Sequence, residues 1–285
     1  MTIAAGFVAR DGIVLCADTQ ETYGQLLKLN TPKMIVRPDS FIPGGPRIVF
    51  AGAGHGPFID KLANEAWKRV STRTPVGQFA EVCDDIESLI KDVYEEFGRI
   101  YQTGAMPEAE LIYGVALSGK IGLFKAHGPI VNPISGYTSV GVGLYLADYI
   151  NSRLGLDSPE LADSGWYEIL AIYLLQQAKE YIEGCGGDSH VLTLTPSGRI
   201  SRVDPADVAL IANHISALDR NSSTVLMSSP DLKLTNEEFE GRIEMFVNLA
   251  RKLRAAQGDE RIHIELMRQQ NPLYRIIHRE KENES

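Results

Sequence analysis

The chain opens with Met1-Thr2-Ile3-Ala4-Ala5-Gly6-Phe7-Val8-Ala9-Arg10-Asp11-Gly12-Ile13-Val14-Leu15-Cys16-Ala17-Asp18. Residues 3–9 have the alternation of a β-strand, Arg10-Asp11-Gly12 is a turn signal, and residues 13–17 form a second apolar strand. Because both faces of this predicted hairpin are nearly apolar, we expect it to lie in a sheet that is covered on both sides.

Thr2 directly follows the initiator methionine, which is normally removed when the next residue is small. An N-terminal threonine carries a nucleophilic hydroxyl and a base, its own α-amine, on one residue. The unperturbed pKa of an α-amine is about 7.7–8.0, so the amine can accept the hydroxyl proton near neutral pH. Composition alone favours another interpretation, in which Thr2 is simply the first β-branched residue of a strand.

The composition is that of an ordinary globular chain, long enough for one large domain or two small ones: 285 residues, 44% hydrophobic and 23% charged. The net charge of -9 argues against a nucleic-acid partner, since phosphate binding needs a clustered excess of Lys and Arg. No apolar run approaches a membrane span, and no basic and apolar secretory leader is visible. We therefore expect a cytoplasmic location and no membrane contact.

Cysteine and histidine usage argues against a metal or redox site. The three cysteines, Cys16, Cys83 and Cys185, are scattered and contain no CxxC pair, which fits unpaired thiols in a reducing compartment. The six histidines show no spacing suited to a metal. We expect no metal and no other cofactor.

The chain up to about Val203 alternates blocks of strands with pairs of helices. After a polar segment, strands are expected at 33–36 and 47–51, the second broken by the glycines of residues 52–56. Two helices, a strand pair, two more helices and a last hairpin follow, with expected ranges 58–70, 79–100, 111–117, 121–126, 145–154, 167–182, 190–195 and 199–203. This order predicts an α+β fold, a four-layer α-β-β-α sandwich with both helix pairs outside and two sheets inside.

The sequence changes character at about Asp204. A helix is expected from Pro205 to Leu218, and Thr235-Asn236-Glu237-Glu238 has the form of a capping box ahead of another helix. We therefore divide the chain into a domain over 1–203 and a helical C-terminal extension over 204–285. The extension is more apolar than a free tail should be, so it packs either on its own subunit or on a neighbour; its last apolar residues are Leu273, Tyr274, Ile276 and Ile277.

Four features of the first part of the chain together resemble a proteasome β-type subunit, a member of the N-terminal-nucleophile hydrolases. Relatives in that family include the bacterial two-ring protease HslV and the ancestral-β-subunit-like proteins. The features are the Thr2 start, the phrase from Asp11 to Asp18, the Lys33-Met34 strand start, and Phe50-Ala51-Gly52-Ala53-Gly54 entering a helix. The resemblance continues more faintly to Val203 through the order of elements, and it does not cover the C-terminal stretch.

The resemblance implies a threonine-type endopeptidase acting on a peptide or unfolded protein. Thr2 would attack a peptide carbonyl, and water would clear the acyl-enzyme. Lys33 would lower the pKa of the Thr2 amine towards the working pH, Asp18 would hold Lys33 charged, and the Gly52 N–H would serve as the oxyanion donor. Each residue also has a purely structural interpretation: an Asx turn for Asp18, an edge-strand charge for Lys33, and a turn into a helix for Gly52.

The resemblance also implies a specificity pocket and an assembly. By alignment Glu21, Thr31, Ile35 and Phe50 line the pocket for the side chain before the scissile bond. If Glu21 points inward, the pocket would favour a basic residue. The family works as closed rings, so we expect a homo-oligomer of ring or open-ring form.

Three departures from the family pattern leave other functions open. Val142, Ile182 and Cys185 stand where the family usually has a serine, an aspartate and a second serine around the threonine amine. Asp188 or Ser189 could enter from the next turn instead. A catalytically inactive structural or regulatory ring subunit, or an amidohydrolase acting on a small amide, is therefore an alternative. We expect Cys185 to be a small packed residue rather than a redox centre.

Overall fold

The computed structural model describes residues 2–23, 27–72, 78–100, 107, 109–154 and 162–270, with the backbone alone for 22, 23, 27, 100 and 256–270. The chain divides into two compact units, Met1–Val208 and Ala209–Ser285. The first unit holds the strands of the described ranges and the candidate site.

The predicted N-terminal hairpin lies at the centre of the first sheet. Strands β1 (Ile3–Ala9) and β2 (Gly12–Asp18) pair antiparallel with Val8 opposite Ile13, and every residue of β2 is buried. The five-stranded sheet has the order β10-β1-β2-β11-β12, and its other strands are β10 (Tyr137–Gly141), β11 (Ser189–Leu194) and β12 (Ile200–Arg202). Asp18 is thus the C-terminal residue of a fully buried strand, β2.

A second five-stranded sheet packs face to face with the first. It has the order β5-β6-β7-β8-β9, with every neighbouring pair antiparallel. Its strands are β5 (Met34–Arg37), β6 (Arg47–Gly54), β7 (Ala109–Leu117), β8 (Lys120–His127) and β9 (Ile130–Ile134). The core between the sheets joins Ala4 and Leu15 of the first sheet to Val49, Ala51 and Ile112 of the second.

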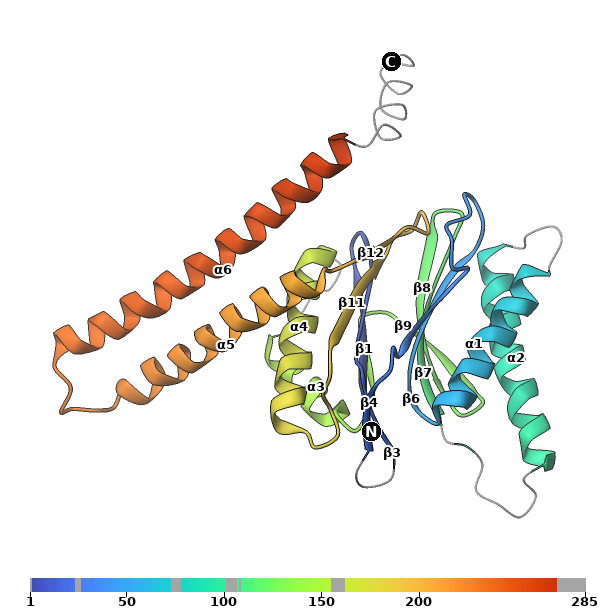
Figure 1. The fold of residues 1–285 in the computed structure, drawn as a ribbon, viewed down its shortest axis with the longest axis horizontal. Helices are drawn as coiled ribbons and strands as arrows, with labels where there is room; N and C mark the ends of the chain where they lie inside the picture. The colour runs from blue at the N-terminus through green and yellow to red at the C-terminus, as the bar shows by residue number, and fades with distance from the viewer. Residues whose placement is uncertain are drawn as a thin grey trace. The chain divides into compact units, whose positions relative to one another are not determined.

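Two pairs of helices cover the outer faces of the two sheets, as Figure 1 shows. Helices α1 (Gly56–Ser71) and α2 (Phe79–Ile100) bury their apolar stripes on the outer face of the second sheet, where Leu62, Ile86 and Ile90 are almost fully enclosed. Helix α4 (Ser164–Tyr181) packs on β1, β2 and β11, and α3 (Leu144–Leu154) packs beside it. The predicted four-layer α-β-β-α sandwich is confirmed.

Three strand predictions were incomplete. The polar segment after Asp18 forms a small two-stranded sheet of β3 (Gln20–Tyr23) and β4 (Leu27–Asn30). Strands β9 and β10 occupy residues that the sequence left without a predicted element. Strand β6 continues through Gly52 to Gly54, so these glycines extend the strand and do not break it.

Helices α5 (Pro205–Ser228) and α6 (Asn236–Gln270) follow the last strand, and α5 runs ten residues beyond its predicted end at Leu218. The predicted capping box is present: the Thr235 N–H donates to Glu238 Oε2 at 2.9 Å, and the Glu238 N–H donates to Thr235 Oγ1 at 3.3 Å. Arg242 of α6 donates to the Ser228 hydroxyl of α5. Leu273, Tyr274, Ile276 and Ile277 lie outside the described residues.

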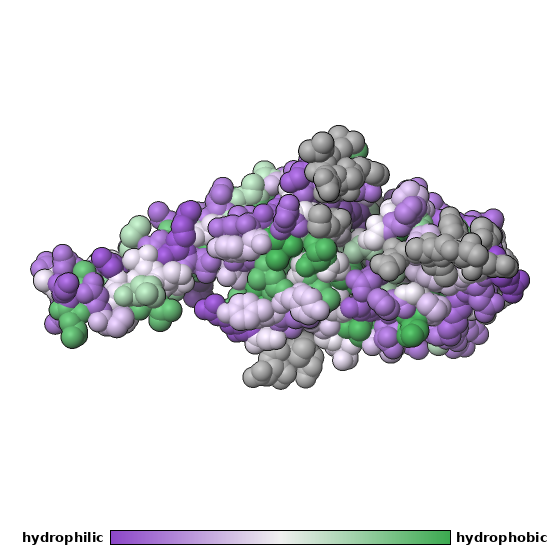
Figure 2. Space-filling view, turned by 90° about the horizontal axis from the view of Figure 1, so that it is seen from below, coloured by the Kyte–Doolittle hydropathy of each residue, from purple (hydrophilic) through white to green (hydrophobic). Residues whose placement is uncertain are grey.

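The surface of the α5–α6 hairpin carries apolar side chains among charged ones. Leu226, Met227 and Leu232 are all largely exposed, and Figure 2 shows such hydrophobic residues among hydrophilic ones on this part of the chain. Across the described ranges, no helix has the length and hydropathy that a membrane span requires.

Candidate active site

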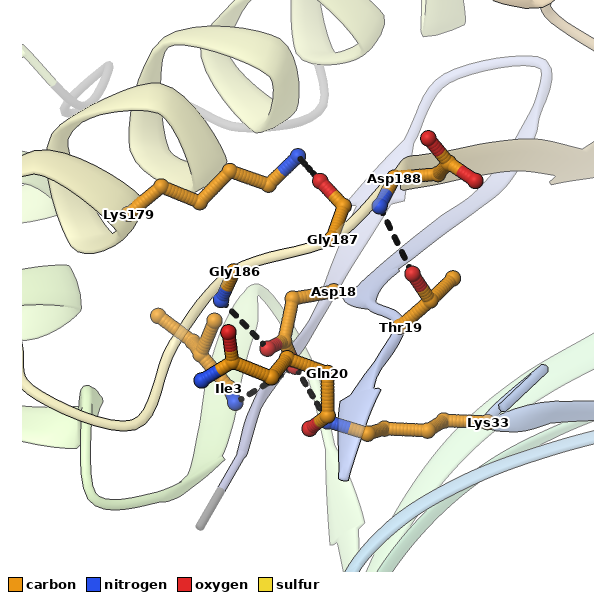
Figure 3. Close-up of polar contacts among 9 residues, drawn as sticks. All are labelled: Ile3, Asp18, Thr19, Gln20, Lys33, Lys179, Gly186, Gly187 and Asp188. Carbon is orange, nitrogen blue, oxygen red and sulfur yellow. Dashed lines mark hydrogen bonds and ion pairs between the residues drawn. The ribbon is translucent and has the colours of Figure 1, made fainter. Parts of the chain in front are cut away.

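Asp18 is the centre of a buried hydrogen-bond network (Figure 3). Its side chain has no exposed surface. The Oδ1 atom accepts the N–H of Ile3 at 3.1 Å and the Lys33 ammonium at 2.7 Å, and Oδ2 accepts the N–H of Gly186 at 3.0 Å. Three donors thus satisfy a carboxylate that would otherwise be costly to bury.

Lys33 stands just before β5 and reaches across to the end of β2. Its Nζ donates to Asp18 and to the carbonyl oxygen of Gln20, and its side chain is only 9% exposed. Burial lowers the pKa of Lys33, while the Asp18 carboxylate acts in the opposite direction. The pair is therefore a charge-assisted bond held in a largely dry environment.

Thr2 lies next to this pair, directly before β1. It is 6% exposed, and the following residue, Ile3, is the one whose N–H binds Asp18. The Thr2 carbonyl is held close to Gly141: a Cβ on residue 141 would lie 2.1 Å from that oxygen. Gly141 also has a φ of +93°, which favours glycine. The chain around Thr2 is therefore fixed from two sides.

A cleft of about 230 Å³ opens beside Thr2. It brings together most of the predicted site residues, and its lining comprises Thr2, Glu21, Thr31, Pro32, Lys33, Ile35, Gly52, Gly54, Gly56, Pro57, Ile59 and Asp60. Asp18 lies behind Lys33 and does not line the cleft. Glu21 faces the start of α1, because a Cβ on Gly56 would lie 3.2 Å from Glu21 Oε1.

The prediction that Phe50 lines this pocket is wrong. Phe50 is 1% exposed and belongs to the core between β6 and the helices α1 and α2, where its ring lies 5.7 Å from that of Tyr113. Residue 50 is on the face of β6 that these helices cover, so its side chain packs in the core and does not line the cleft.

Gly52 occupies a position where a side chain would be crowded. A Cβ there would lie 2.9 Å from Leu111 Cδ2 and 3.0 Å from the Glu110 carbonyl oxygen. The absence of a side chain also leaves the backbone of residue 52 open at the cleft wall, where a ligand can approach it closely.

Of the residues that complete the network, the sequence pointed only to Asp188. Gly186 and the Gln20 carbonyl act through backbone atoms, and no side-chain motif marks such atoms. Thr19 exchanges two hydrogen bonds with Asp188: the Thr19 N–H donates to the Asp188 carbonyl at 3.1 Å, and the Asp188 N–H donates to Thr19 Oγ1 at 2.7 Å. Figure 3 shows the Asp188 carboxylate directed away from the Asp18–Lys33 pair, so Asp188 contributes its backbone to this network.

The three departures from the family pattern place no polar side chain in the described lining of the cleft. Val142 is 44% exposed after β10, and Ile182 is the C-cap residue of α4. Cys185 is buried and unpaired, as expected, and burial, reinforced by the Asp18 charge, raises its thiol pKa to about 11. Within the described ranges, no group of three or more His, Cys, Asp or Glu residues is placed to hold a metal ion.

No family model matches the sequence, and neither does any curated protein. Solved structures do match. Anbu (ancestral β-subunit) from Yersinia bercovieri superimposes with a TM-score of 0.63 at 15% identity, over 81% of this chain and 100% of that chain. The chain has the Anbu fold.

Two further Anbu structures support this result. The Gly-1 mutant of Anbu from Hyphomicrobium sp. strain MC1 gives a TM-score of 0.63 at 15% identity, over 79% of this chain and 97% of that chain. The helical assembly of the Anbu complex from Pseudomonas aeruginosa gives a TM-score of 0.60 at 16% identity, over 82% of this chain and 100% of that chain. The predicted resemblance to an ancestral-β-subunit-like protein is thus confirmed in the fold.

Proposed function

We propose that this chain is an Anbu-type threonine peptidase of the proteasome family, in which Thr2 becomes the N-terminal nucleophile once Met1 is removed. The observation that carries the proposal is the buried Lys33–Asp18 pair beside Thr2 at the wall of a cleft. A threonine that merely began a strand would not need a desolvated lysine next to it.

The proposed chemistry follows from this arrangement. The Thr2 hydroxyl attacks the peptide carbonyl and its proton passes to the Thr2 α-amine. The charge of Lys33 lowers the pKa of that amine towards the working pH, and Asp18 holds the charge in place. The C–N bond then breaks, the protonated amine supplies a proton to the leaving group, and water hydrolyses the ester on Thr2.

The Gly52 N–H is the proposed donor to the oxyanion. Gly52 lines the cleft together with Thr2, and the adjacent α1 begins at Gly56 with its N-terminus towards the same cleft. Donors and helix N-termini of this kind stabilise developing negative charge.

The cleft favours a substrate side chain with positive charge. Glu21 faces into the cleft near the α1 terminus, and Asp60 adds a second carboxylate to the lining. Lys33, the one cation among the described lining residues, is already paired with Asp18. A peptide with Arg or Lys before the scissile bond therefore suits the site best, and faster cleavage after Leu or Tyr than after Arg would contradict this assignment.

A catalytically inactive ring subunit is the second candidate, because Val142, Ile182 and Cys185 stand where the family usually has a serine, an aspartate and a second serine. An amidohydrolase acting on a small amide would use the same residues as the peptidase. Turnover of a peptide substrate would favour the peptidase over both the inactive subunit and the small-amide amidohydrolase.

We also propose that the protein works as a homo-oligomer in the cytoplasm. The Anbu complex of Pseudomonas aeruginosa forms a helical assembly. In this chain, α3 and the segment just before it expose four large side chains that a neighbouring copy could cover: Val142, Tyr145, Tyr149 and Leu154.

The test is steady-state cleavage of a fluorogenic peptide with Arg before the scissile bond. Thr2→Ala should abolish turnover, and Lys33→Ala should lower kcat/KM by at least about 100-fold. The matched controls are Thr224→Ala and Lys120→Ala, exposed positions outside the site that should leave turnover unchanged. Equal loss in the controls, or full activity of Thr2→Ala, would overturn the proposal.

A further inference from the structure

Three arginines line a cavity of about 700 Å³ that is distinct from the candidate active site. Arg37 ends β5, Arg47 begins β6 and Arg202 ends β12, so two sheets contribute to the cavity. Among the described residues, its lining comprises Pro32, Met34, Ile35, Val36, Arg37, Asp39, Arg47, Ile200 and Arg202. We refer to it as the arginine cavity.

Arg47 is the unusual member of this set. It is only 8% exposed, and its Nε and Nη1 atoms are enclosed without a hydrogen-bond partner among the described residues. An enclosed guanidinium with unfilled donors is costly unless an anion compensates it. Burial lowers the pKa of Arg47, the Asp39 charge opposes this shift, and the neighbouring Arg202 has a smaller effect in the same direction as burial. The surroundings of Arg47 thus disfavour the charged form of its guanidinium group.

The other charges around Arg47 do not resolve this imbalance. Asp39, the single carboxylate among the lining residues that the structure describes, is paired with Arg37 Nη1 at 2.7 Å and is itself 87% exposed. Arg37 is further held by Asn64, whose Oδ1 accepts from Nη2 at 2.9 Å. Three guanidinium groups against one carboxylate leave two positive charges in the cavity wall.

We propose that the arginine cavity binds a phosphate group carried by a small molecule. A phosphate carries about 1.5 to 2 negative charges at pH 7, which matches the two uncompensated positive charges better than one carboxylate does. Guanidinium groups are well suited to phosphate oxygens. The volume lies within the ordinary range of ligand sites, about 300–1,000 Å³, and Ile35, Val36 and Ile200 provide an apolar wall for the remainder of the ligand.

The bound phosphate would lie next to the candidate active site without occupying it. Pro32 and Ile35 line both the arginine cavity and the cleft, and the segment that carries Lys33 continues into β5 and ends at Arg37. The site stands independently of the proposed peptidase activity, because its residues include neither Thr2 nor Lys33.

Titration calorimetry of the full chain with inorganic phosphate at constant ionic strength tests the proposal. We expect saturable binding of one phosphate per chain, and affinity for acetate at least about tenfold weaker. Arg47→Met and Arg202→Gln should each weaken phosphate binding at least about tenfold. Arg199→Gln, an exposed arginine of the same hairpin outside the cavity, is the matched control and should bind normally.

A second measurement covers the case in which one variant fails to fold. Phosphate should raise the melting temperature of the wild type and of Arg199→Gln, but not that of Arg202→Gln, whose side chain is exposed and whose fold is not at risk. Without phosphate, Arg47→Met should melt above the wild type, since it removes an enclosed unpaired charge. Absence of saturable phosphate binding, equal binding by all variants, or a preference for acetate would overturn the proposal.

Discussion

Lys33 donates to Asp18 across 2.7 Å in an ion pair whose two side chains are 9% and 0% exposed. The pair joins the end of β2 in one sheet to the start of β5 in the other, so it fixes the separation of the two sheets beside Thr2. Removing one member of such a pair leaves the other as a buried, uncompensated charge.

Asp18→Asn should therefore lower the free energy of unfolding by about 3–5 kcal/mol, the usual cost of breaking a buried pair from one side. Urea denaturation followed by circular dichroism measures it. The control is Glu87→Gln, which removes the exposed pair with Lys91 within α2 and should cost no more than about 0.5 kcal/mol. Similar costs for the two variants would show that the Lys33–Asp18 pair is not a buried pair in solution.

Gly141→Ala should displace the chain at Thr2. The new methyl group would lie 2.1 Å from the Thr2 carbonyl oxygen, at a residue whose φ is +93°. We expect a loss of at least about 3 kcal/mol in unfolding free energy, together with loss of peptide turnover. Gly128→Ala separates the two causes, because its φ is also positive but nothing lies within 4 Å of its Cβ. Gly128→Ala should lower the free energy of unfolding by only about 1–2 kcal/mol and leave peptide turnover intact.

The fold was largely predictable because its core elements have strong apolar patterns. The N-terminal hairpin, α1, α2 and α4 carry nearly unbroken periodic stripes that predict both their type and their order. Strands β3 and β4 were missed because Gln20-Glu21-Thr22-Tyr23 and Leu27-Lys28-Leu29-Asn30 are polar and belong to a sheet of only two strands. β9 was missed because it is a short edge strand with Pro133 inside it.

The site was predictable where side chains carry it and unpredictable where the backbone does. Thr2, Asp18 and Lys33 are visible as residue types at a recognisable spacing. Gly186 binds Asp18 from 168 residues away in the sequence, and only the folded chain brings the two together. Gly52 was read as the break that ends a strand, whereas it lies inside β6, where an added Cβ would lie 2.9 Å from Leu111 Cδ2.

The three thiols should be unreactive in the folded protein. Burial raises the pKa of Cys16 and Cys83 to about 12 and that of Cys185 to about 11. The thiolate fraction at pH 7 is then about one in ten thousand or less. Mass spectrometry after iodoacetamide treatment should find no adduct on the native chain and three on the denatured chain. Rapid labelling of Cys185 in the native protein would contradict its placement.

The same thiols predict loss of stability at alkaline pH. Because each folded-state pKa is raised, the unfolded chain loses its thiol protons first, beginning near its own pKa of about 8.5. The stabilising contribution is complete below that pH and disappears as the pH rises towards about 11 to 12. Urea midpoints should stay level between pH 7 and about pH 8 and then fall steadily up to pH 11. A flat profile would show that the thiols are not buried.

Truncation after Asp231 should reduce the size of the assembly, since it removes α6 and its apolar side chains Ile243, Met245 and Val247. Light scattering coupled to size-exclusion chromatography measures the mass. Thr235→Ala keeps α6 and removes only its cap, at about 1 kcal/mol, so it should assemble normally. A full-length chain that stays a monomer of 31.4 kDa at micromolar concentration would contradict the proposed homo-oligomer.

The most direct test of Thr2 as the nucleophile is the intact mass of the purified chain before and after exposure to a β-lactone. The account predicts a chain that has lost Met1 and gains one inhibitor mass, with fragmentation placing the adduct on Thr2 and with no adduct on Thr2→Ala. A chain that keeps Met1 in its native host, or an adduct that persists in Thr2→Ala, would contradict it, because Thr2 would then have no free amine to act as its base or no part in the reaction.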